Sequence, residues 1–405
     1  MIKTKQYDLI AICEYYPDEK NPGNSLWVYE QVVGLQNNGL RSIVISPTPY
    51  IPLLLRGLKL FKYHPKSNKY IKNYNNTDVI RPQYIKYPRN KCINKTINNI
   101  SKVIFSHGEK YNPKLIHAHF GGTGVASLDL KRKLNIPLVT YFYGYDVGVG
   151  KHKEFLKTLY KELIKEGDLF LALSNDMKND LINIGFPSEK IEVLHLGVNV
   201  DLFKPTPKKE SGKIIFTTVG RFHKFKGAQD AISAFEKVHS IHKNIELHIV
   251  GDGTYVNSLK NQVNSLNLEN SIIFINNFVA KNPREVVLNE ILNCDVFLHT
   301  AFQNESGVKT GTPVVLMEAQ ACAKPCISTF YAGIPEIVTN NRTGFLVKQR
   351  DIEEIANSMI KLINNEKLRN TLGANGRKHI VKEFNNNLQM KKLADFYSEL
   401  IRNNY

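Results

Sequence analysis

Short apolar segments alternate with longer amphipathic stretches along the whole chain. The apolar segments of the first half predict strands at residues 7–13, 41–47, 115–120, 137–144, 169–174 and 191–197. Those of the second half predict strands at residues 213–220, 245–251, 271–277, 295–301, 324–329 and 344–347. Helical patterns separate several of these strands; SLWVYEQVVGLQNNG, for example, ends in a glycine as helices often do. Buried strands that alternate with helices are typical of parallel sheets covered on both faces.

The two halves of the chain therefore predict two doubly wound α/β domains. The segment NVDLFKPTPKKESGK between them contains two prolines, a glycine and a lysine cluster, as linkers do. We expect a first Rossmann-like domain at residues 1–197, a linker at 198–212 and a second Rossmann-like domain at 213–384. Residues 385–405 show a helical pattern that we expect to return to the first domain. Each domain would place its ligand sites at the carboxyl ends of its strands, facing a cleft between the domains.

The composition is that of a globular protein and argues against several classes. Of the 405 residues, 42% are hydrophobic and 22% are charged. There is no run of 18 apolar residues, so we expect no transmembrane helix. The N-terminal residues lack the plan of a signal peptide. The five cysteines are scattered, which argues against zinc and favours reduced thiols in the cytoplasm.

The net charge of +17 is concentrated in one part of the chain. Between Ile51 and Phe105 there are twelve basic residues, and only Asp78 opposes them. This region is less regular than the rest and fits an insertion; it opens with IPLLLRGLKLFKY, in which apolar and basic residues interleave. That pattern favours an anionic membrane surface, and hence a peripheral position at the inner face of the plasma membrane. A second interpretation of this basic stretch is that its charges are simply solvated, in a protein rich in lysine. A third is binding to nucleic acid, but no nucleic-acid-binding module is recognisable.

The loop GRFHKFKG follows the first predicted strand of the second half. Gly220 allows a sharp turn, and Arg221 and Lys226 place two cations just before a predicted helix. Two cations in this position are suited to a diphosphate, because arginine offers a planar fork and lysine a point charge. A solvated loop is the alternative. The loop is neither a Walker motif nor a dinucleotide fingerprint, and the sequence GDG at residues 251–253 lacks the third glycine.

The stretch KTGTPVVLMEAQA places a carboxylate, Glu318, shortly after a Gly-Thr-Pro turn. The turn should lead into a helix, whose free N–H groups attract anions. Glu318 would then either complement the helix dipole on a solvated face or accept hydrogen bonds from sugar hydroxyls. Together with the cation loop, it would suit a nucleotide: phosphates on Arg221 and Lys226, and ribose hydroxyls on Glu318.

At this point the sequence resembles the family 4 retaining glycosyltransferases, which have the GT-B fold. GRFHKFKG is similar to the family's phosphate-binding loop, and GTPVVLMEAQACAKPCIST to its nucleotide-sugar loop and helix. YYPDEKNPGNSLWVYEQVVGLQNNG resembles its opening glycine loop and first helix. HAHFG and GYD resemble its acceptor-side motifs, and the resemblance covers nearly the whole chain.

The resemblance implies a role for each matching residue. The catalytic residues would be Arg221, Lys226 and Glu318. The donor-binding residues would be Gly23, Gly220, Thr310, Gly311, Thr312, Pro313 and Val314. The acceptor side would hold His119, Tyr143 and Asp146. For His117 and His119 a purely structural role is the alternative, and for Asp146 the alternative is capping of a helix start.

Two positions depart from the family pattern. The family usually has a glutamate eight residues before the ribose-binding one, where this chain has Thr310; Glu305 lies nearby but five residues off. It also often has a histidine where this chain has Tyr143. Both positions belong to the sugar end of the site, so we expect intact nucleotide binding and unusual handling of the donor sugar.

The resemblance implies transfer of a sugar from a nucleotide-sugar donor with anomeric retention and without a metal or other cofactor. The leaving diphosphate would be stabilised by the loop cations. The acceptor would be a lipid-linked saccharide in surface-polysaccharide assembly. Capsule, exopolysaccharide, lipopolysaccharide core and teichuronic-type polymers are all open, and the opening segment looks most like the exopolysaccharide or teichuronic acid enzymes of the family. The alternative is a nucleotide-sugar-binding relative that has lost its chemistry and acts as a scaffold; Thr310 and Tyr143 favour that alternative.

Overall fold

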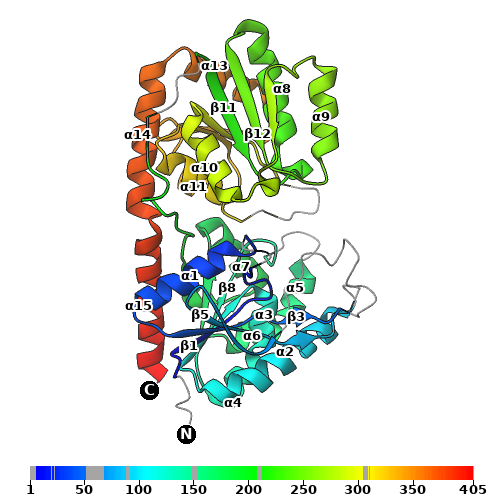
Figure 1. The fold of residues 1–405 in the computed structure, drawn as a ribbon. Helices are drawn as coiled ribbons and strands as arrows, with labels where there is room; N and C mark the ends of the chain where they lie inside the picture. The colour runs from blue at the N-terminus through cyan, green and yellow to red at the C-terminus, as the bar shows by residue number, and fades with distance from the viewer. Residues whose placement is uncertain are drawn as a thin grey trace. The chain divides into compact units, whose positions relative to one another are not determined.

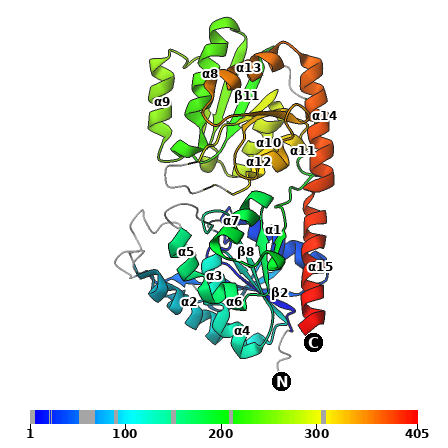
Figure 2. The same ribbon diagram turned by 180° about the vertical axis from the view of Figure 1, so that it is seen from behind.

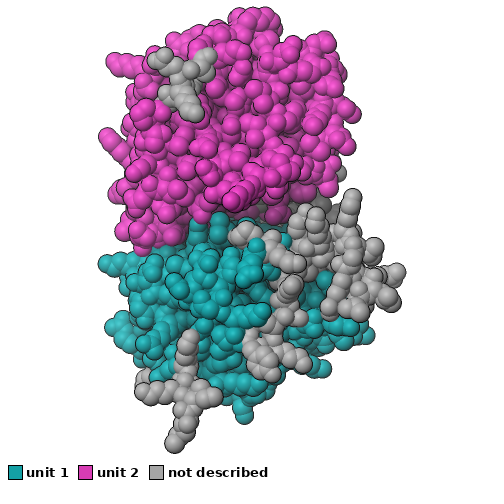
Figure 3. Space-filling model, viewed as in Figure 1, with its two compact units in different colours: residues 1–195, 389–405 teal, residues 196–388 magenta. Residues whose placement is uncertain are grey.

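The computed structural model describes residues 6–19, 21, 23–51, 68–87, 92–147, 153–207, 212–303, 309 and 311–404, with the side chains of 68–70 left aside. The chain forms two compact units (Figure 3). The first unit consists of residues 1–195 and 389–405, and the second of residues 196–388.

The first unit is built on a sheet with the strand order β10-β9-β8-β7-β1-β2-β5-β4 (Figure 1). Its strands, with the small β3–β6 pair beside it, are β1 Leu9–Ile12, β2 Ser42–Ile45, β3 Thr48–Pro49, β4 Asn68–Tyr74, β5 Thr77–Arg81, β6 Gln83–Tyr84, β7 Leu115–His119, β8 Leu138–Tyr141, β9 Leu169–Ala172 and β10 Ile191–Val193. Every pairing in the large sheet is parallel except that of β4 with β5. The six strands predicted for this half are confirmed.

The hairpin β4–β5 was not predicted from the sequence. Its two central residues, Asn75 and Asn76, have φ values of 45° and 66° and connect the paired residues Tyr74 and Thr77. Two successive left-handed residues are the requirement of a type I′ turn, which matches the twist of a hairpin and which asparagine tolerates well. The buried strands were predicted from continuous apolar runs. Neither strand of this hairpin has such a run, so the hairpin was missed.

Helices cover the sheet of the first unit (Figures 1 and 2). They are α1 Leu26–Asn37, α2 Ile93–Gly108, α3 Gly121–Ala126, α4 Leu128–Leu134, α5 Lys153–Leu159, α6 Lys161–Glu166, α7 Asn175–Ile184 and α15 Asn386–Asn404, with 3-10 turns at Glu109–Tyr111 and Ser188–Lys190. Helix α1 ends as the sequence predicted, because Gly39 adopts a φ of 86° and its N–H bonds back to Gln36.

The C-terminal helix α15 packs beside α1. A Cβ atom at Gly34 of α1 would lie 2.2 Å from Cγ of Met390, so only glycine permits this close approach. Further along α15, the buried Tyr397 places its ring 5.5 Å from that of His117 at the edge of the central strands. The last residues of the chain are therefore part of the first unit.

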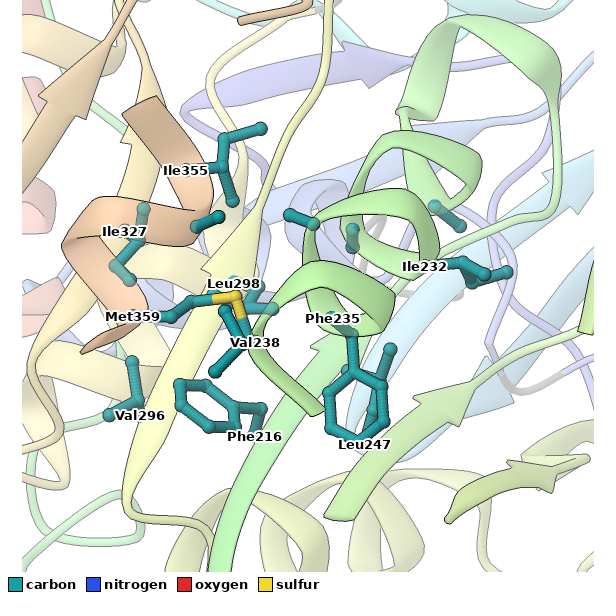
Figure 4. Close-up of a cluster of buried hydrophobic side chains, with 14 of the residues drawn as sticks. Phe216, Ile232, Phe235, Val238, Leu247, Val296, Leu298, Ile327, Ile355 and Met359 are labelled. Atoms are coloured by element: carbon teal, nitrogen blue, oxygen red, sulfur yellow. The ribbon is translucent and has the colours of Figure 1, made fainter. Parts of the chain in front are cut away.

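The second unit has a six-stranded parallel sheet with the order β13-β12-β11-β14-β15-β16. Its strands are β11 Ile214–Val219, β12 Ile245–Val250, β13 Ile272–Ile275, β14 Val296–His299, β15 Cys326–Thr329 and β16 Gly344–Val347. These six strands confirm the prediction for the second half. Figure 4 shows the core on one face of the sheet, where Phe216 and Leu298 pack against Phe235 of α8 (Ala228–Ile241) and Met359 of α13 (Ile352–Ile363).

Sequence signals fix several helix starts of this unit. Its helices are α8 Ala228–Ile241, α9 Val256–Ser265, α10 Pro283–Asn293, α11 Val314–Ala321, α12 Ile334–Ile337, α13 Ile352–Ile363 and α14 Glu366–Glu383, with 3-10 turns at Lys224–Lys226 and Asn277–Val279. The side chains of Asn282, Asp351 and Asn365 each accept a hydrogen bond from the backbone N–H three residues on. These caps satisfy N–H groups that the helix itself leaves without partners.

The segment expected to be a linker is anchored in the second unit over its first residues. Phe203 is fully buried, and the guanidinium of Arg377 on α14 donates hydrogen bonds to the carbonyls of Val200 and Phe203, at 2.9 and 2.7 Å. Residues 198–203 are thus packed structure, and the linker-like composition belongs only to the residues that follow them.

Candidate functional site

The second sheet has one topological switch point, between β11 and β14. The chain builds outward from β11 to β12 and β13, and then returns to build β14, β15 and β16 on the other side. Loops after two such strands leave the sheet in opposite directions and open a crevice at its carboxyl edge, where ligands of doubly wound proteins bind. The loop of Gly220–Gly227 follows β11, and the residues leading to α11 follow β14. Both motifs singled out in the sequence of this half therefore flank the switch point.

The cation loop is held tightly to the end of β14. Gly227 has a φ of 80°, and a Cβ atom on it would lie 1.9 Å from the carbonyl oxygen of Thr300. The Thr300 hydroxyl donates a hydrogen bond of 2.7 Å to the carbonyl of Gly227, and the N–H of Phe302 donates one of 3.0 Å to Phe225. At Gly220, by contrast, a Cβ atom would meet nothing within 4 Å. The close approach that requires glycine is thus at the end of the loop, directly before α8.

The two predicted cations lack countercharges in the part of the chain that the structure describes. Arg221 is exposed and Lys226 is half-buried, and neither forms an ion pair with a described carboxylate. Burial lowers the pKa of Lys226 to about 8, with a smaller contribution from Arg221. Helix α8 begins two residues after Lys226, so its N-terminal N–H groups add to the same positive region. This arrangement suits an anion with two phosphoryl groups.

A buried histidine that sequence reasoning missed lies at the same edge. His299 is the last residue of β14, is 4% exposed, and its Nε2 has no hydrogen-bond partner among the described residues. Burial lowers the pKa of His299 to about 3, and the charge of Lys226 acts in the same direction. The imidazole is therefore neutral. Nothing in the strand pattern DVFLHTA distinguished this residue from the core around it.

Glu318 lies within the first two turns of α11, as predicted, but not on a solvated face. Its exposed fraction is 8%, so the alternative of a solvent-facing helix-dipole partner is wrong. Pro313 is the N-cap of this helix rather than a residue of its first turn. Thr312 is buried, whereas Gly311, Pro313 and Val314 are partly exposed. Thr310 and Glu305 lie outside the described residues.

The first sheet has its own switch point, between β1 and β7. From β1 the chain builds towards β2 and β5, and then starts again on the other side at β7 and continues to β8. His119 is the last residue of β7, and Tyr143 follows β8 by two positions. The two side chains share a hydrogen bond of 2.7 Å between Nδ1 and the hydroxyl oxygen. His119 and Tyr143, two of the residues predicted for the acceptor side, are therefore in direct contact, and Asp146 joins them through the backbone of Tyr143.

His117 and His119 form a buried pair with tilted rings. Their ring centroids are 3.9 Å apart and neither side chain is exposed. Burial lowers the pKa of both, to about 3 for His117 and well below 6.5 for His119. Both nitrogens of His117 lack hydrogen-bond partners among the residues described, and its ring is held by contacts with the rings of His119, Tyr141 and Tyr397.

Asp146 caps the start of α3, which is one of the two roles predicted for it. Its Oδ2 accepts a hydrogen bond of 2.9 Å from the N–H of Gly121, the first residue of α3. Its Oδ1 accepts from the N–H groups of Tyr143 and Gly144, at 2.9 and 3.0 Å. These bonds oppose the burial that raises the pKa of Asp146. Asp146 thereby fixes the loop that carries Tyr143 against the end of β7.

Arg81 holds the loop after β1 in place. The sequence had included this arginine in the basic stretch 51–105, for which a membrane surface was the favoured interpretation. Arg81 is 5% exposed and donates hydrogen bonds to the carbonyls of Tyr16 and Pro17, at 3.0 and 2.5 Å. It is therefore a buried tether and does not belong to a membrane-facing surface. Gly23, farther along this loop, is exposed, and a Cβ atom there would meet nothing within 4 Å.

The remaining basic residues of the stretch 51–105 divide into two groups. Lys72, Lys86, Lys95 and Lys102 are exposed. The side chains of Arg56, Lys59, Lys62, Lys66, Lys69, Arg89 and Lys91 lie outside the described part of the chain. Within the residues described, no helix is long and apolar enough to cross a bilayer, and no group of three or more His, Cys, Asp or Glu side chains could hold a metal ion. None of the five cysteines forms a disulfide.

Two family models match the chain side by side. Residues 23–202 match the model of Glycosyltransferase Family 4, and residues 199–379 match that of Glycosyl transferases group 1. The second match includes both strands of the switch point between β11 and β14, and the first match begins after β1 and includes β7.

Curated relatives include glycosyltransferases of polysaccharide synthesis. WcaL of Escherichia coli K12, a candidate colanic acid biosynthesis glycosyltransferase, is 30% identical over 59% of this chain and 59% of its own length. The amylovoran biosynthesis glycosyltransferase AmsK of Erwinia amylovora is 26% identical over 74% of this chain and 73% of its own. An Escherichia coli UDP-Gal:α-D-GlcNAc-diphosphoundecaprenol α-1,3-galactosyltransferase is 26% identical over 73% and 77%.

Solved structures share the fold. Sucrose-phosphate synthase from Thermosynechococcus elongatus superposes with a TM-score of 0.79 at 19% identity, over 98% of this chain and all of that one. Anabaena HepE, solved in complex with UDP-glucose, gives 0.71 at 17% identity over 97% and 100%. The order of strands in the two sheets, the cation loop at the second switch point and the two adjoining family matches agree, and the chain belongs to the family 4 and group 1 glycosyltransferases with the GT-B fold.

Proposed function

We propose that this chain is a metal-independent, retaining glycosyltransferase. It takes a sugar from a nucleotide-sugar donor and transfers it to a lipid-linked saccharide during surface-polysaccharide assembly. The observation that carries the proposal is the pair Arg221 and Lys226, two cations without described ion-pair partners, beside the start of α8 at a topological switch point.

The donor's diphosphate binds to this positive region. Arg221 contributes the exposed fork and Lys226 the half-buried point charge, while the N–H groups at the start of α8 donate hydrogen bonds to the remaining phosphoryl oxygens. Glu318 binds the ribose hydroxyls, because a carboxylate that is only 8% exposed is desolvated and therefore selective for hydrogen-bond donors. The relative named for UDP-Gal and the structure solved with UDP-glucose make uridine diphosphate the first nucleotide to test.

The reaction breaks the bond between the anomeric carbon and the diphosphate oxygen and forms one to the acceptor hydroxyl on the same face. The proton of that hydroxyl passes to the leaving phosphate oxygen. Arg221 and Lys226 stabilise the negative charge that develops on the diphosphate, which is the work a metal ion does in other transferases.

The lipid-linked acceptor implies a peripheral place at the inner face of the plasma membrane. Tyr50, Ile71, Ile85 and Tyr87 are exposed apolar residues in this part of the chain. Exposed Lys72 and Lys86 accompany them. Apolar and basic side chains together suit the interface of an anionic bilayer.

A second candidate function is that of a nucleotide-sugar-binding scaffold without turnover. Tyr143 favours it, because the phenol hydrogen-bonded to His119 replaces the histidine that the family often has at this position. The two functions share the donor site and differ only in chemistry.

Thermal unfolding with a panel of nucleoside diphosphates and nucleotide sugars tests the proposal, in EDTA and without added metal. A ligand that binds only the folded state raises the melting temperature. We expect one nucleotide to raise it, and its sugar conjugate to raise it further. Lys226→Ala should abolish the shift, whereas Lys224→Ala, which removes an exposed lysine from the same turn, should keep it. A shift that needs a divalent cation would contradict the metal-independent proposal.

Turnover separates the enzyme from the scaffold. Release of the nucleoside diphosphate in the presence of membrane lipid extract marks an enzyme. Nucleotide-sugar binding without release, in wild type and in Tyr143→His, marks the scaffold.

A further inference from the structure

Glu14 stands at the carboxyl end of β1, on one side of the switch point of the first sheet. It follows the strand Leu9–Ile12 by two residues. On the other side of the same switch point are His119 and, one strand farther, Tyr143. The Cys13 thiol, next to Glu14, lies near enough to Tyr143 to influence the pKa of the phenol. Glu14 and the predicted acceptor side therefore occupy one edge of one sheet.

The Glu14 side chain is held at one oxygen only. The hydroxyl of Tyr84 on β6, which is 3% exposed, donates a hydrogen bond of 2.7 Å to Oε2. No residue that the structure describes donates a hydrogen bond to Oε1. The backbone of Glu14 is also fixed, since Ser46 on the neighbouring segment donates to its carbonyl at 3.3 Å. The carboxylate is thus oriented by a neutral partner and keeps an accepting oxygen.

Glu14 has no described ion-pair partner to explain its position. Lys86, whose charge acts on Glu14, is exposed and donates a hydrogen bond of 3.5 Å to the hydroxyl of Tyr15 instead. Burial raises the pKa of Glu14, against the opposing effects of Tyr84 and Lys86. A half-buried carboxylate without an ion-pair partner costs folding free energy, and such costs are typical of binding and catalytic positions.

Asp146 does not supply an equivalent group. Its two oxygens accept three backbone hydrogen bonds that hold the loop of Tyr143. Between Glu14 and Asp146, Glu14 is the one with an oxygen left for a ligand.

We propose that Glu14 is an acceptor-binding residue: its Oε1 accepts a hydrogen bond from a hydroxyl of the acceptor saccharide, while Tyr84 orients the carboxylate through Oε2. The inference rests on the proposed function and deepens it, since it assigns a polar contact to the acceptor. It also gives the inserted strands after β2 a role, because Tyr84 comes from β6.

The experiment measures direct binding of soluble saccharides to the full-length chain. The probes are the methyl glycosides of glucose, galactose, mannose and N-acetylglucosamine, followed by saturation-transfer NMR with uridine diphosphate present. We expect at least one glycoside to bind, and Glu14→Ala to weaken it about tenfold or more, as loss of a hydrogen bond to a charged group implies. Glu14→Gln keeps the shape and the Tyr84 contact and should weaken binding less. Glu19→Ala is the matched control, because Glu19 is an exposed glutamate of the same loop.

Two results would overturn the inference: binding of no glycoside to the wild-type chain, or glycoside binding that Glu14→Ala and Glu14→Gln leave unchanged. A loss that Glu19→Ala reproduces equally would also overturn it. The thermal shift with uridine nucleotides is recorded on the same samples. An unchanged shift in Glu14→Ala shows that the variant is folded, and failure of that shift in the wild type would count against the proposed function separately.

Discussion

The hydroxyl of Tyr143 and Nδ1 of His119 lie 2.7 Å apart inside the first unit, and this bond links the ends of two adjacent strands. Tyr143 is 8% exposed and His119 is fully buried. Tyr143, which stands where the family often has a histidine, is thus buried and held in place by a hydrogen bond. Its hydroxyl is also 3.4 Å from Oε1 of Gln31 on α1.

Removing this hydroxyl should destabilise the first unit. Tyr143→Phe leaves a buried histidine nitrogen without its partner, which costs about 1–3 kcal/mol. Urea unfolding followed by the fluorescence of Trp27 measures the change, because the only tryptophan of the chain lies in this unit, with its ring 6.1 Å from that of Tyr143. The control is Tyr145→Phe, since Tyr145 is 86% exposed in the same loop. Equal stability of the two variants would refute the assignment.

Gly227→Ala should disrupt the cation loop. Its Cβ atom would collide with the carbonyl of Thr300, and alanine is strained at a φ of 80°. A left-handed conformation alone costs about 1–3 kcal/mol, and the collision adds to it. Differential scanning calorimetry of the second unit's transition measures the loss, and we expect weaker nucleotide binding as well. Gly220→Ala has open space and should unfold within a few degrees of wild type; a larger loss there than at Gly227 would contradict the geometry.

The first unit should lose stability in mild acid. His117 and His119 have pKa values below their usual value in the folded state, so the unfolded chain binds more protons as the pH falls below about 6.5. Their stabilising effect is complete above that pH and is lost progressively towards the folded pKa, which is about 3 for His117. Each histidine contributes a slope of roughly 1.4 kcal/mol per pH unit.

Unfolding curves at pH 7.5 and 5.5, read through Trp27, test this acid dependence. His117→Phe should reduce the slope of the unfolding free energy against pH by roughly 1.4 kcal/mol per pH unit, which corresponds to one proton. His107→Phe is the control, because His107 is half-buried on α2, away from the pair. A slope that His117→Phe leaves intact would show that other groups take up the protons.

Nucleotide binding should weaken as the pH rises through about 8. The pKa of Lys226 is lowered to about 8, so the free protein loses the charge of this side chain above that pH, and binding of a diphosphate must then take up a proton. Isothermal titration with uridine diphosphate between pH 7 and 9.5 measures the effect. Lys226→Arg, which stays charged, should flatten the profile. An equally steep profile in that variant would assign the proton to another group.

Glu318→Ala should weaken nucleotide binding and leave the second unit folded. The buried carboxylate is the predicted partner of the ribose hydroxyls, and its loss should lower affinity for uridine diphosphate about tenfold or more. The discriminating ligand is 2′,3′-dideoxyuridine diphosphate: it should bind wild type and variant alike. An affinity for the ribonucleotide that the variant retains would leave Glu318 with a structural role only.

The sequence by itself determined the buried strands and the loops that follow them. Runs such as IIFTTV and LIHAH have no Asp, Glu, Lys or Arg and place apolar residues on both faces, which favours a strand buried on both sides in a parallel sheet. The carboxyl ends of parallel strands share one edge of a sheet. The strand pattern therefore placed four site residues at such edges: Arg221, Lys226, His119 and Tyr143. The resemblance to a family added their expected roles.

Only the tertiary structure decided which polar residues are buried and what holds them. The sequence included Arg81 among the surface cations. The hairpin β4–β5 instead brings Arg81 to the carbonyls of Tyr16 and Pro17, where it holds the loop after β1. His299 and Glu14 gave no sequence signal, since a single polar residue at the end of an apolar run looks the same whether it faces solvent, core or ligand. Such residues depend on neighbours that are distant in the chain, as Tyr84 is from Glu14, and those neighbours are set by packing.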